Sequence, residues 1–171
     1  MSKQFIIKPL EGIEWEHMTI ALGASQSSII EVLGQPENAI GISFYYYGSE
    51  LRIDFDENQC VKFIEFLGGP DGQIQPQIYG VSAFETDADE LVKLLKEHND
   101  GEIDDSENGY SYTFLNISVG IYRESIPEDV QEMIKEAESD GDPMAAEAIE
   151  YETKRAAHWA TIGIGVKNYY S

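Results

Sequence analysis

The sequence predicts an α+β fold in which helices cover one face of a curved antiparallel sheet. Residues 42–67 hold three runs of aromatic and β-branched residues separated by two short polar breaks, which is typical of an antiparallel meander. A helix followed by strands recurs after residue 78. With 171 residues and 42% hydrophobic content, the chain can form one core. We therefore expect one domain over residues 1–171, built from two helix–meander repeats.

The first repeat is predicted over residues 10–69. Ser25 can cap a helix at 26–33, while Gly34 suits the position after its end and Pro36 prevents continuation. Residues 12–18 show no clear period. The strands that we expect in this half lie at 4–8, 42–47, 50–55 and 60–67.

The second repeat is predicted over residues 78–171, after a linker at 73–80. Thr86 and Asp89 have the spacing of a capping box, so a helix is expected at 87–98. Strands are expected at 110–114, 117–122 and 159–170. Glycines in the last strand, Gly163 and Gly165, indicate a bulge or the close approach of another element.

A helical hairpin is predicted as an insertion over residues 127–157, between the second and third strands of the second repeat. Pro127 fits the first position of one helix, and Asp142 with Pro143 fits the start of another. The six main strands would form one curved antiparallel sheet with the two early helices on one face.

The charge balance bears on partners. The chain has 32 acidic and 11 basic residues, a formal net charge of −21. Such an excess repels phosphate backbones and anionic lipid, so we expect no nucleic-acid or membrane binding and, instead, attraction of a basic partner. Solubility alone is the alternative reason for the charge.

Targeting signals and disulfides are not expected. Cys60 is the single cysteine, so no intrachain disulfide can form, and no run approaches the length of a membrane helix. The apolar run near the start is too short for a signal peptide, so a cytoplasmic protein is expected.

No motif predicts a metal, a cofactor or catalysis. Asp54, Asp56, Asn58 and Glu65 follow a calcium-loop spacing, but Gln59 stands where that loop needs glycine. The acidic stretch at 100–107 and the scattered histidines lack the spacing of ligand sets. We expect no metal, no cofactor and no enzymatic activity.

The first repeat resembles a known fold. The segment Leu22-Gly23-Ala24-Ser25, then Val32-Leu33-Gly34-Gln35-Pro36 and a tyrosine-rich strand, is similar to a repeat of the β-lactamase-inhibitor-protein-like fold. Acidic immunity proteins and other cytosolic bacterial proteins of this layout share the likeness. The resemblance implies the tandem fold and a protein-binding role. It does not imply β-lactamase inhibition, because the secreted inhibitor has disulfides and lacks the inserted hairpin.

Tyrosines and acidic side chains make up the expected contact surface. Tyrosine is a common interface anchor, and acidic groups steer a basic partner. The predicted contact residues are Tyr45, Tyr46, Tyr47, Tyr110, Tyr112, Asp104, Asp105, Glu128, Asp129 and Glu132.

Three functions fit these patterns. The first is a non-enzymatic protein-binding module, most concretely an immunity protein that neutralises a bacterial toxin such as a basic nuclease. The second is a small-molecule-binding or enzymatic domain with a cleft beside the hairpin, using Glu124, His158 and Trp159. The third is a self-associating protein, in which open sheet edges pair to form a dimer.

Overall fold

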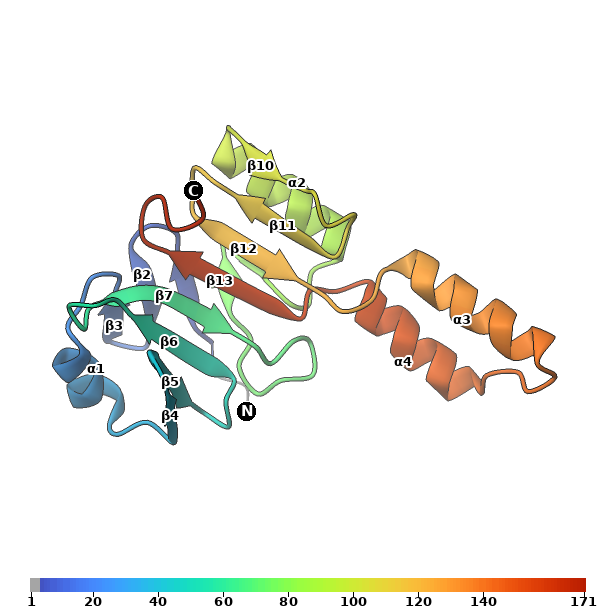
Figure 1. Ribbon diagram of the computed structural model, residues 1–171, viewed down its shortest axis with the longest axis horizontal. Helices are drawn as coiled ribbons and strands as arrows, with labels where there is room; N and C mark the ends of the chain where they lie inside the picture. The colour runs from blue at the N-terminus through green and yellow to red at the C-terminus, as the bar shows by residue number, and fades with distance from the viewer. Residues whose placement is uncertain (1–3) are drawn as a thin grey trace.

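Two β-sheets share one hydrophobic core in the computed structural model, which describes residues 4–171 (Figure 1). Over these described residues the fold is α+β, with four helices, as the sequence predicts. The core joins both halves of the chain, since Ile13 from one end and Ile164 from the other belong to the same buried cluster.

The larger sheet has eight strands in the order β10-β11-β12-β13-β7-β6-β5-β4, all antiparallel. Its first four strands in the chain are β4 (Asn38–Ile40), β5 (Ser43–Tyr46), β6 (Leu51–Phe55) and β7 (Val61–Phe66). The other four are β10 (Ile103–Asp104), β11 (Ser111–Phe114), β12 (Val119–Tyr122) and β13 (Thr161–Gly165). The six main strands are those that the sequence predicts, and β4 and β10 extend the sheet at its two edges.

The smaller sheet was not predicted. Its order is β3-β2-β1-β8-β9, antiparallel except for the parallel pair β1 and β8. Its strands are β1 (Ile6–Lys8), β2 (Gly12–Trp15), β3 (Met18–Ala21), β8 (Gln77–Ile78) and β9 (Val81–Ser82). The expectation that residues 73–80 are only a linker is wrong, because this segment adds β8 beside β1. Strands this short leave too few residues for an alternating pattern to show.

Two helices begin and end close to the predicted positions. α1 (Gln26–Leu33) starts where Ser25 Oγ accepts from the amide of Ser28, and Gly34 follows it with a φ of 83°. α2 (Ala88–Asn99) is capped by Asp87, whose carboxylate accepts from the amide of Asp89. The predicted cap at Thr86 is therefore wrong by one residue, because Asp87 supplies the stronger acceptor.

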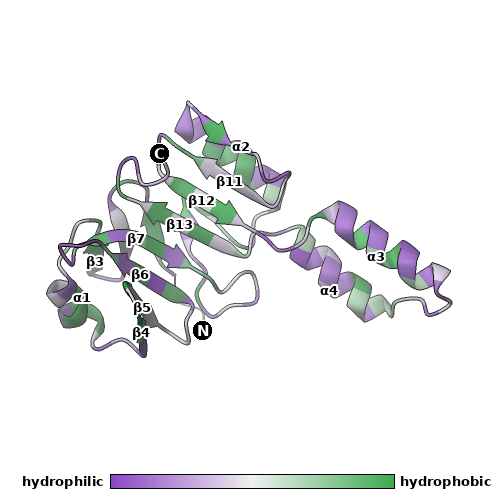
Figure 2. Cartoon of the chain, in the orientation of Figure 1, coloured by the Kyte–Doolittle hydropathy of each residue, from purple (hydrophilic) through white to green (hydrophobic). Residues whose placement is uncertain are grey.

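The helical hairpin projects away from both sheets (Figure 1). It consists of α3 (Pro127–Ser139) and α4 (Ala146–Ala156). Pro127 is the first residue of α3, as predicted, whereas α4 begins after Ala145 and not at Asp142, so the predicted cap there is wrong. Figure 2 shows hydrophilic residues along much of both helices, and Val130 and Ala156 are their only buried positions among the described residues.

The order of elements follows the predicted pattern. α1 precedes β4–β7 and α2 precedes β10–β13, with the hairpin between β12 and β13. The two sets of strands meet at the centre of the sheet, where β7 pairs with β13. That the two halves are related repeats stays a prediction.

Strand alternation divides the large sheet into a core face and an outer face. Ile53 on β6, Ile64 on β7 and Ile162 on β13 point into the shared core. Arg52, Glu65 and Gly163, which alternate with them along these strands, face the other side. None of the helices in the described part of the chain is both long and apolar enough to cross a membrane.

Candidate functional site

A pocket at the base of the hairpin gathers several of the predicted contact residues. It has a volume of about 450 Å³ and lies where the first turns of α2 and α3 meet the loop before β11. Its lining residues are Asp89, Asp105, Asn108, Gly109, Tyr112, Arg123, Ile126, Pro127 and Glu128. We call it the acidic pocket, because Asp89, Asp105 and Glu128 contribute three carboxylates to it.

Arg123 forms part of the wall of this pocket and is only 6% exposed. Its Nε donates to Gly109 O at 2.9 Å and its Nη1 to Ala156 O at 2.6 Å, while the guanidinium lies 4.6 Å from the ring centroid of Trp159. Burial lowers the pKa of Arg123, and the nearby charge of Asp89 acts in the opposite direction. These contacts fix the guanidinium to the backbone and the indole, so it joins the start of the hairpin to its end.

Two more predicted residues join α3 to the sheet beside the pocket. The hydroxyl of Tyr110 donates to Asp129 Oδ2 at 2.5 Å, and the same carboxylate oxygen accepts from the amide of Ile126 at 3.1 Å. These hydrogen bonds lower the pKa of Asp129 and raise that of Tyr110. Both side chains are therefore engaged within the molecule and act as structural ties at the start of α3.

The remaining acidic predictions lie around this site. Glu132 is exposed on α3, one turn beyond Glu128. Asp104 accepts from the amide and the hydroxyl of Ser106, which lowers its pKa, and it does not line the pocket. Asp89 and Arg123 were not predicted as contact residues, because Asp89 fitted the start of a helix and Arg123 stood alone in an acidic stretch.

The tyrosines predicted on the meander do not share one surface. Tyr46 is 4% exposed, donates to Gly34 O at 3.0 Å and has a pKa raised by burial to about 12, so its side chain is not offered to a partner. Tyr47 follows the end of β5 with a φ of 55° and packs with its ring 6.0 Å from that of Phe5. Tyr45 alone points to the outer face, where Arg52 is its cross-strand neighbour. The structure thus separates Tyr45 from the two residues that follow it.

The outer face of the large sheet holds a network of charges. Arg52 lies 3.2 Å from Asp54 through Nε and 3.2 Å from Glu65 through Nη1. Asp54 also accepts from the hydroxyl of Ser43 at 2.5 Å. Burial raises the pKa of Glu65 and the charge of Arg52 opposes this shift.

Residues after β13 fold over the same face. Tyr169 stacks on Phe63 with ring centroids 4.7 Å apart, and Tyr170 meets Phe63 edge-on at 6.2 Å. Burial raises the pKa of Tyr170. A pocket of about 230 Å³, which we call the outer-face pocket, opens beside these rings and includes Tyr122, which is 45% exposed. Sequence reasoning missed these tyrosines, because it placed 159–170 in one strand.

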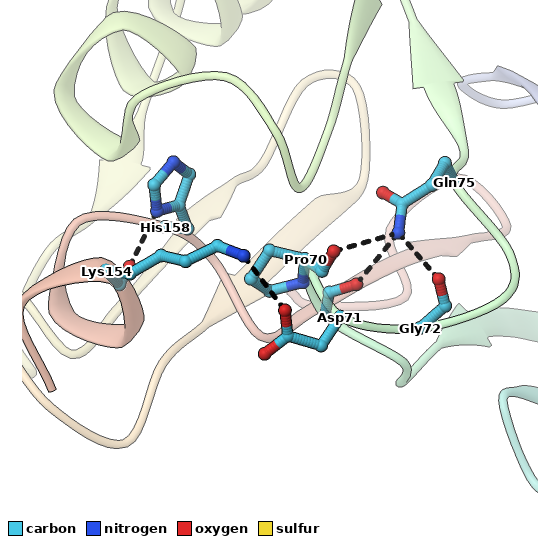
Figure 3. A network of polar contacts seen from close by, with 7 residues as sticks. Pro70, Asp71, Gly72, Gln75, Lys154 and His158 are labelled. Atoms are coloured by element: carbon cyan, nitrogen blue, oxygen red, sulfur yellow. Dashed lines mark hydrogen bonds and ion pairs between the residues drawn. The ribbon is translucent and has the colours of Figure 1, made fainter. Parts of the chain in front are cut away.

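A cleft lies on the other side of the hairpin base, between α4 and the loop that follows β7. Its volume is about 200 Å³, and Lys154 pairs with Asp71 at 2.9 Å and Arg155 with Glu124 at 3.0 Å along it. Figure 3 shows Gln75 holding the loop, with Nε2 donating to the carbonyls of Pro70 and Gly72. The same nitrogen also donates to Gly69 O at 3.3 Å. His158 Nδ1 lies 2.6 Å from Lys154 O, which can only accept, so that nitrogen carries a proton.

Metal chemistry has no candidate ligand set in residues 4–171, where no group of three or more His, Cys, Asp or Glu side chains could hold an ion. No protein-family model, curated protein or solved structure matches the chain. The resemblance to the β-lactamase-inhibitor-protein-like fold therefore stays a prediction from the sequence.

Proposed function

We propose that this chain is a non-enzymatic protein-binding module that takes a basic partner at the acidic pocket. The observation that carries the proposal is the meeting of Asp89, Asp105 and Glu128 around one pocket beside Tyr112. The three carboxylates come from α2, from the loop before β11 and from α3, so only the folded chain brings them together.

The shape and charge of the pocket suit a lysine or arginine side chain. Its volume of about 450 Å³ exceeds what a metal ion needs, and its carboxylates do not form an ion-binding cluster within the described residues. Arg123 is held by two carbonyl oxygens and stacked on Trp159. Its charge acts on Asp89 and Glu128, but no ion pair within residues 4–171 includes any of the three carboxylates. A basic side chain of the partner would supply the missing cation.

The hairpin extends this acidic surface. From Glu124 to Glu152 the segment has one basic residue, Lys135. Its acidic residues are Glu124, Glu128, Asp129, Glu132, Glu136, Glu138, Asp140, Asp142, Glu147, Glu150 and Glu152. Charges of one sign on a projecting element raise the rate of encounter with a partner of opposite charge and select against acidic ones.

The most concrete form of the proposal is an immunity protein for a bacterial toxin. A basic nuclease must hold phosphates with positive side chains, and an acidic protein surface can occupy the same groups. The net charge of −21 and the acidic hairpin support this form of partner.

Affinity purification tests the proposal. The tagged full chain is incubated with lysate of its source cells at low salt, and bound proteins are identified by mass spectrometry and tested as pure proteins. We expect one stoichiometric basic partner whose release rises with salt, because screening weakens exposed charge pairs. Failure to find a basic partner that binds as a pure protein would contradict the proposal.

A second candidate function rests on the cleft beside α4. Glu124, Tyr151 and Arg155 line about 200 Å³ there, in the place where a small-molecule site was predicted. Trp159 is fully buried and does not line the cleft, and His158 is bonded to Lys154 O. Thermal-shift screening of a metabolite library tests this candidate, with Tyr151→Ala as the variant that should lose any shift.

A further inference from the structure

A row of residues crosses the outer face of the large sheet beside the outer-face pocket, and Thr113, Gly120 and Glu65 of this row line the pocket. Strand pairing places Gly120 opposite Thr113 on one side and opposite Gly163 on the other, and Gly163 in turn opposite Glu65. The ring of Tyr170 lies over Gly120 and that of Phe63 over Gly163, in space that a Cβ atom at either glycine would fill, so the pocket opens beside these rings. Phe63, Tyr122, Tyr169 and Tyr170 supply aromatic walls.

The charged side chains that line this pocket are one guanidinium and one carboxylate, those of Arg52 and Glu65, which pair with each other and leave no unpaired charge for an anion or a simple cation. Arg52 contacts Asp54 and Glu65, so the guanidinium has no charge left for a phosphate or carboxylate. The chain as a whole carries −21, which adds to the repulsion of anions. A cation, conversely, would have to approach the guanidinium of Arg52 in the same pocket. A neutral ligand is repelled neither by the negative net charge of the chain nor by the guanidinium of Arg52.

Hydroxyl groups around the pocket have unused hydrogen-bonding capacity. Ser111, Thr113 and Tyr122 line the pocket, and none of their hydroxyls has a partner within residues 4–171. Thr161 lies beside them and its hydroxyl donates to Glu65. Each hydroxyl can both donate and accept, which matches a ligand that carries hydroxyl groups of its own.

The geometry points to a binding site for a neutral saccharide unit, and we propose that the outer-face pocket takes one. A sugar ring offers C–H groups to the aromatic walls and hydroxyls to Thr113, Glu65 and Thr161. The pocket volume of about 230 Å³ suits a single ring that is held between Tyr122 and Tyr170 and open to solvent on one side. This site lies on the opposite side of the sheet from the core and is independent of the acidic pocket.

Titration followed by NMR tests the site on the full chain. The probes are methyl glycosides of glucose, galactose, mannose and N-acetylglucosamine, and the same sugars as glycans on a carrier protein distinguish a free ligand from a glycoprotein. We expect at least one glycoside to shift the amide resonances of Thr113, Tyr122 and Thr161. Tyr122→Ala should weaken that binding by about tenfold, since an aromatic contact contributes on the order of a tenfold change in affinity.

Two further variants keep the test specific. Thr113→Val removes one hydroxyl at constant shape and should weaken binding severalfold without changing the fold. Ile40→Ala removes an exposed apolar side chain, 60% exposed on β4 at the edge of the sheet, and should leave the affinity unchanged. The proposal is overturned if no neutral glycoside shifts these resonances, if Tyr122→Ala binds as tightly as the natural chain, or if a basic peptide shifts them where sugars do not.

Discussion

Gly163 shows how a single residue controls the outer face of the sheet. A Cβ atom at this position would collide with Cζ of Phe63, and one at Gly165 would lie 2.5 Å from Cβ of Tyr169. The sequence predicted either a bulge or the close approach of another element at these glycines, and the structure shows a close approach, by the ring of Phe63 and by Tyr169. Which side chain would approach could not be predicted, because it depends on pairing between β7 and β13.

Gly163→Ala is therefore expected to destabilise the protein by about 1–3 kcal/mol through overpacking. Chemical denaturation measures the change in the free energy of unfolding. The double variant Gly163→Ala with Phe63→Leu removes the ring that the new methyl group meets, so it should be less destabilised than the sum of the two single changes. Additive losses would show that the methyl group does not meet Phe63.

The hydrogen bond between Tyr110 and Asp129 should make the stability of the protein depend on pH. In Tyr110→Phe the carboxylate loses the hydroxyl donor, so the pKa of Asp129 should rise toward its ordinary value of 3.8. NMR titration of the Asp129 carboxyl measures this, and Tyr112→Phe is the control that should leave it unchanged. A carboxyl group whose pKa is lowered in the folded protein stabilises the fold at pH values above its ordinary pKa. This stabilisation is lost as the pH falls through the lowered pKa. The stability difference between Tyr110→Phe and the natural chain should therefore shrink in acid.

At the scale of elements, the predictable parts were those with local signals. α1 has Ser25 before it and Gly34 after it, and its bounds were predicted to the residue. β5, β6 and β7 had long aromatic and β-branched runs. The smaller sheet had no such signal, because β8 and β9 are two residues each and their pairing depends on β1 far away in the chain. The acidic pocket likewise needs three elements that are distant in sequence.

Ser25→Ala tests the most local of these signals. Loss of the hydroxyl that accepts from the amide of Ser28 should cost about 1 kcal/mol, the usual effect of removing a serine N-cap. Thermal and chemical denaturation measure the loss. Ser139→Ala, at an exposed position at the end of α3, should change stability much less, and equal losses from both variants would contradict a capping role for Ser25.

The hairpin should be separable from the rest of the fold. Tyr122 pairs with Thr161 and Ala160 donates to Tyr122 O at 2.8 Å, so β12 and β13 are joined without α3 and α4. Replacing residues 127–155 by a short glycine-rich linker keeps Ala156, which accepts from Arg123. We expect cooperative unfolding and the amide resonances of the two sheets to persist. A chain that fails to unfold cooperatively would show that the hairpin is part of the core.

At the scale of the whole molecule, charge and shape together suggest the function. The amino-acid composition predicted a basic partner. It could not show whether the acidic residues form a binding surface or only keep the protein soluble. The structure brings Asp105 and Glu128 to one pocket with Asp89, and it sends Tyr46 and Tyr47 to the core side. The proposed contact surface therefore keeps Asp105, Tyr112 and Glu128 at the base of the hairpin and leaves out Tyr46 and Tyr47 of the meander.

Two charge-matched variants separate local from overall charge. One is Asp89→Asn, Asp105→Asn and Glu128→Gln in the acidic pocket. The other is Glu136→Gln, Glu138→Gln and Asp140→Asn at the far end of α3, where all three side chains are exposed. Both remove the same formal charge, so an effect of net charge alone would be equal in the two.

Calorimetric titration of the purified basic partner into these two proteins tests the central claim most directly. We expect the affinity of the pocket variant for the partner to fall by at least about tenfold. This corresponds to the loss of charge-assisted hydrogen bonds that contribute about 1.4 kcal/mol or more to binding. The variant at the far end of α3 should bind nearly as well as the natural chain, with a slower association. Equal affinity of the two variants would contradict a binding site at the acidic pocket.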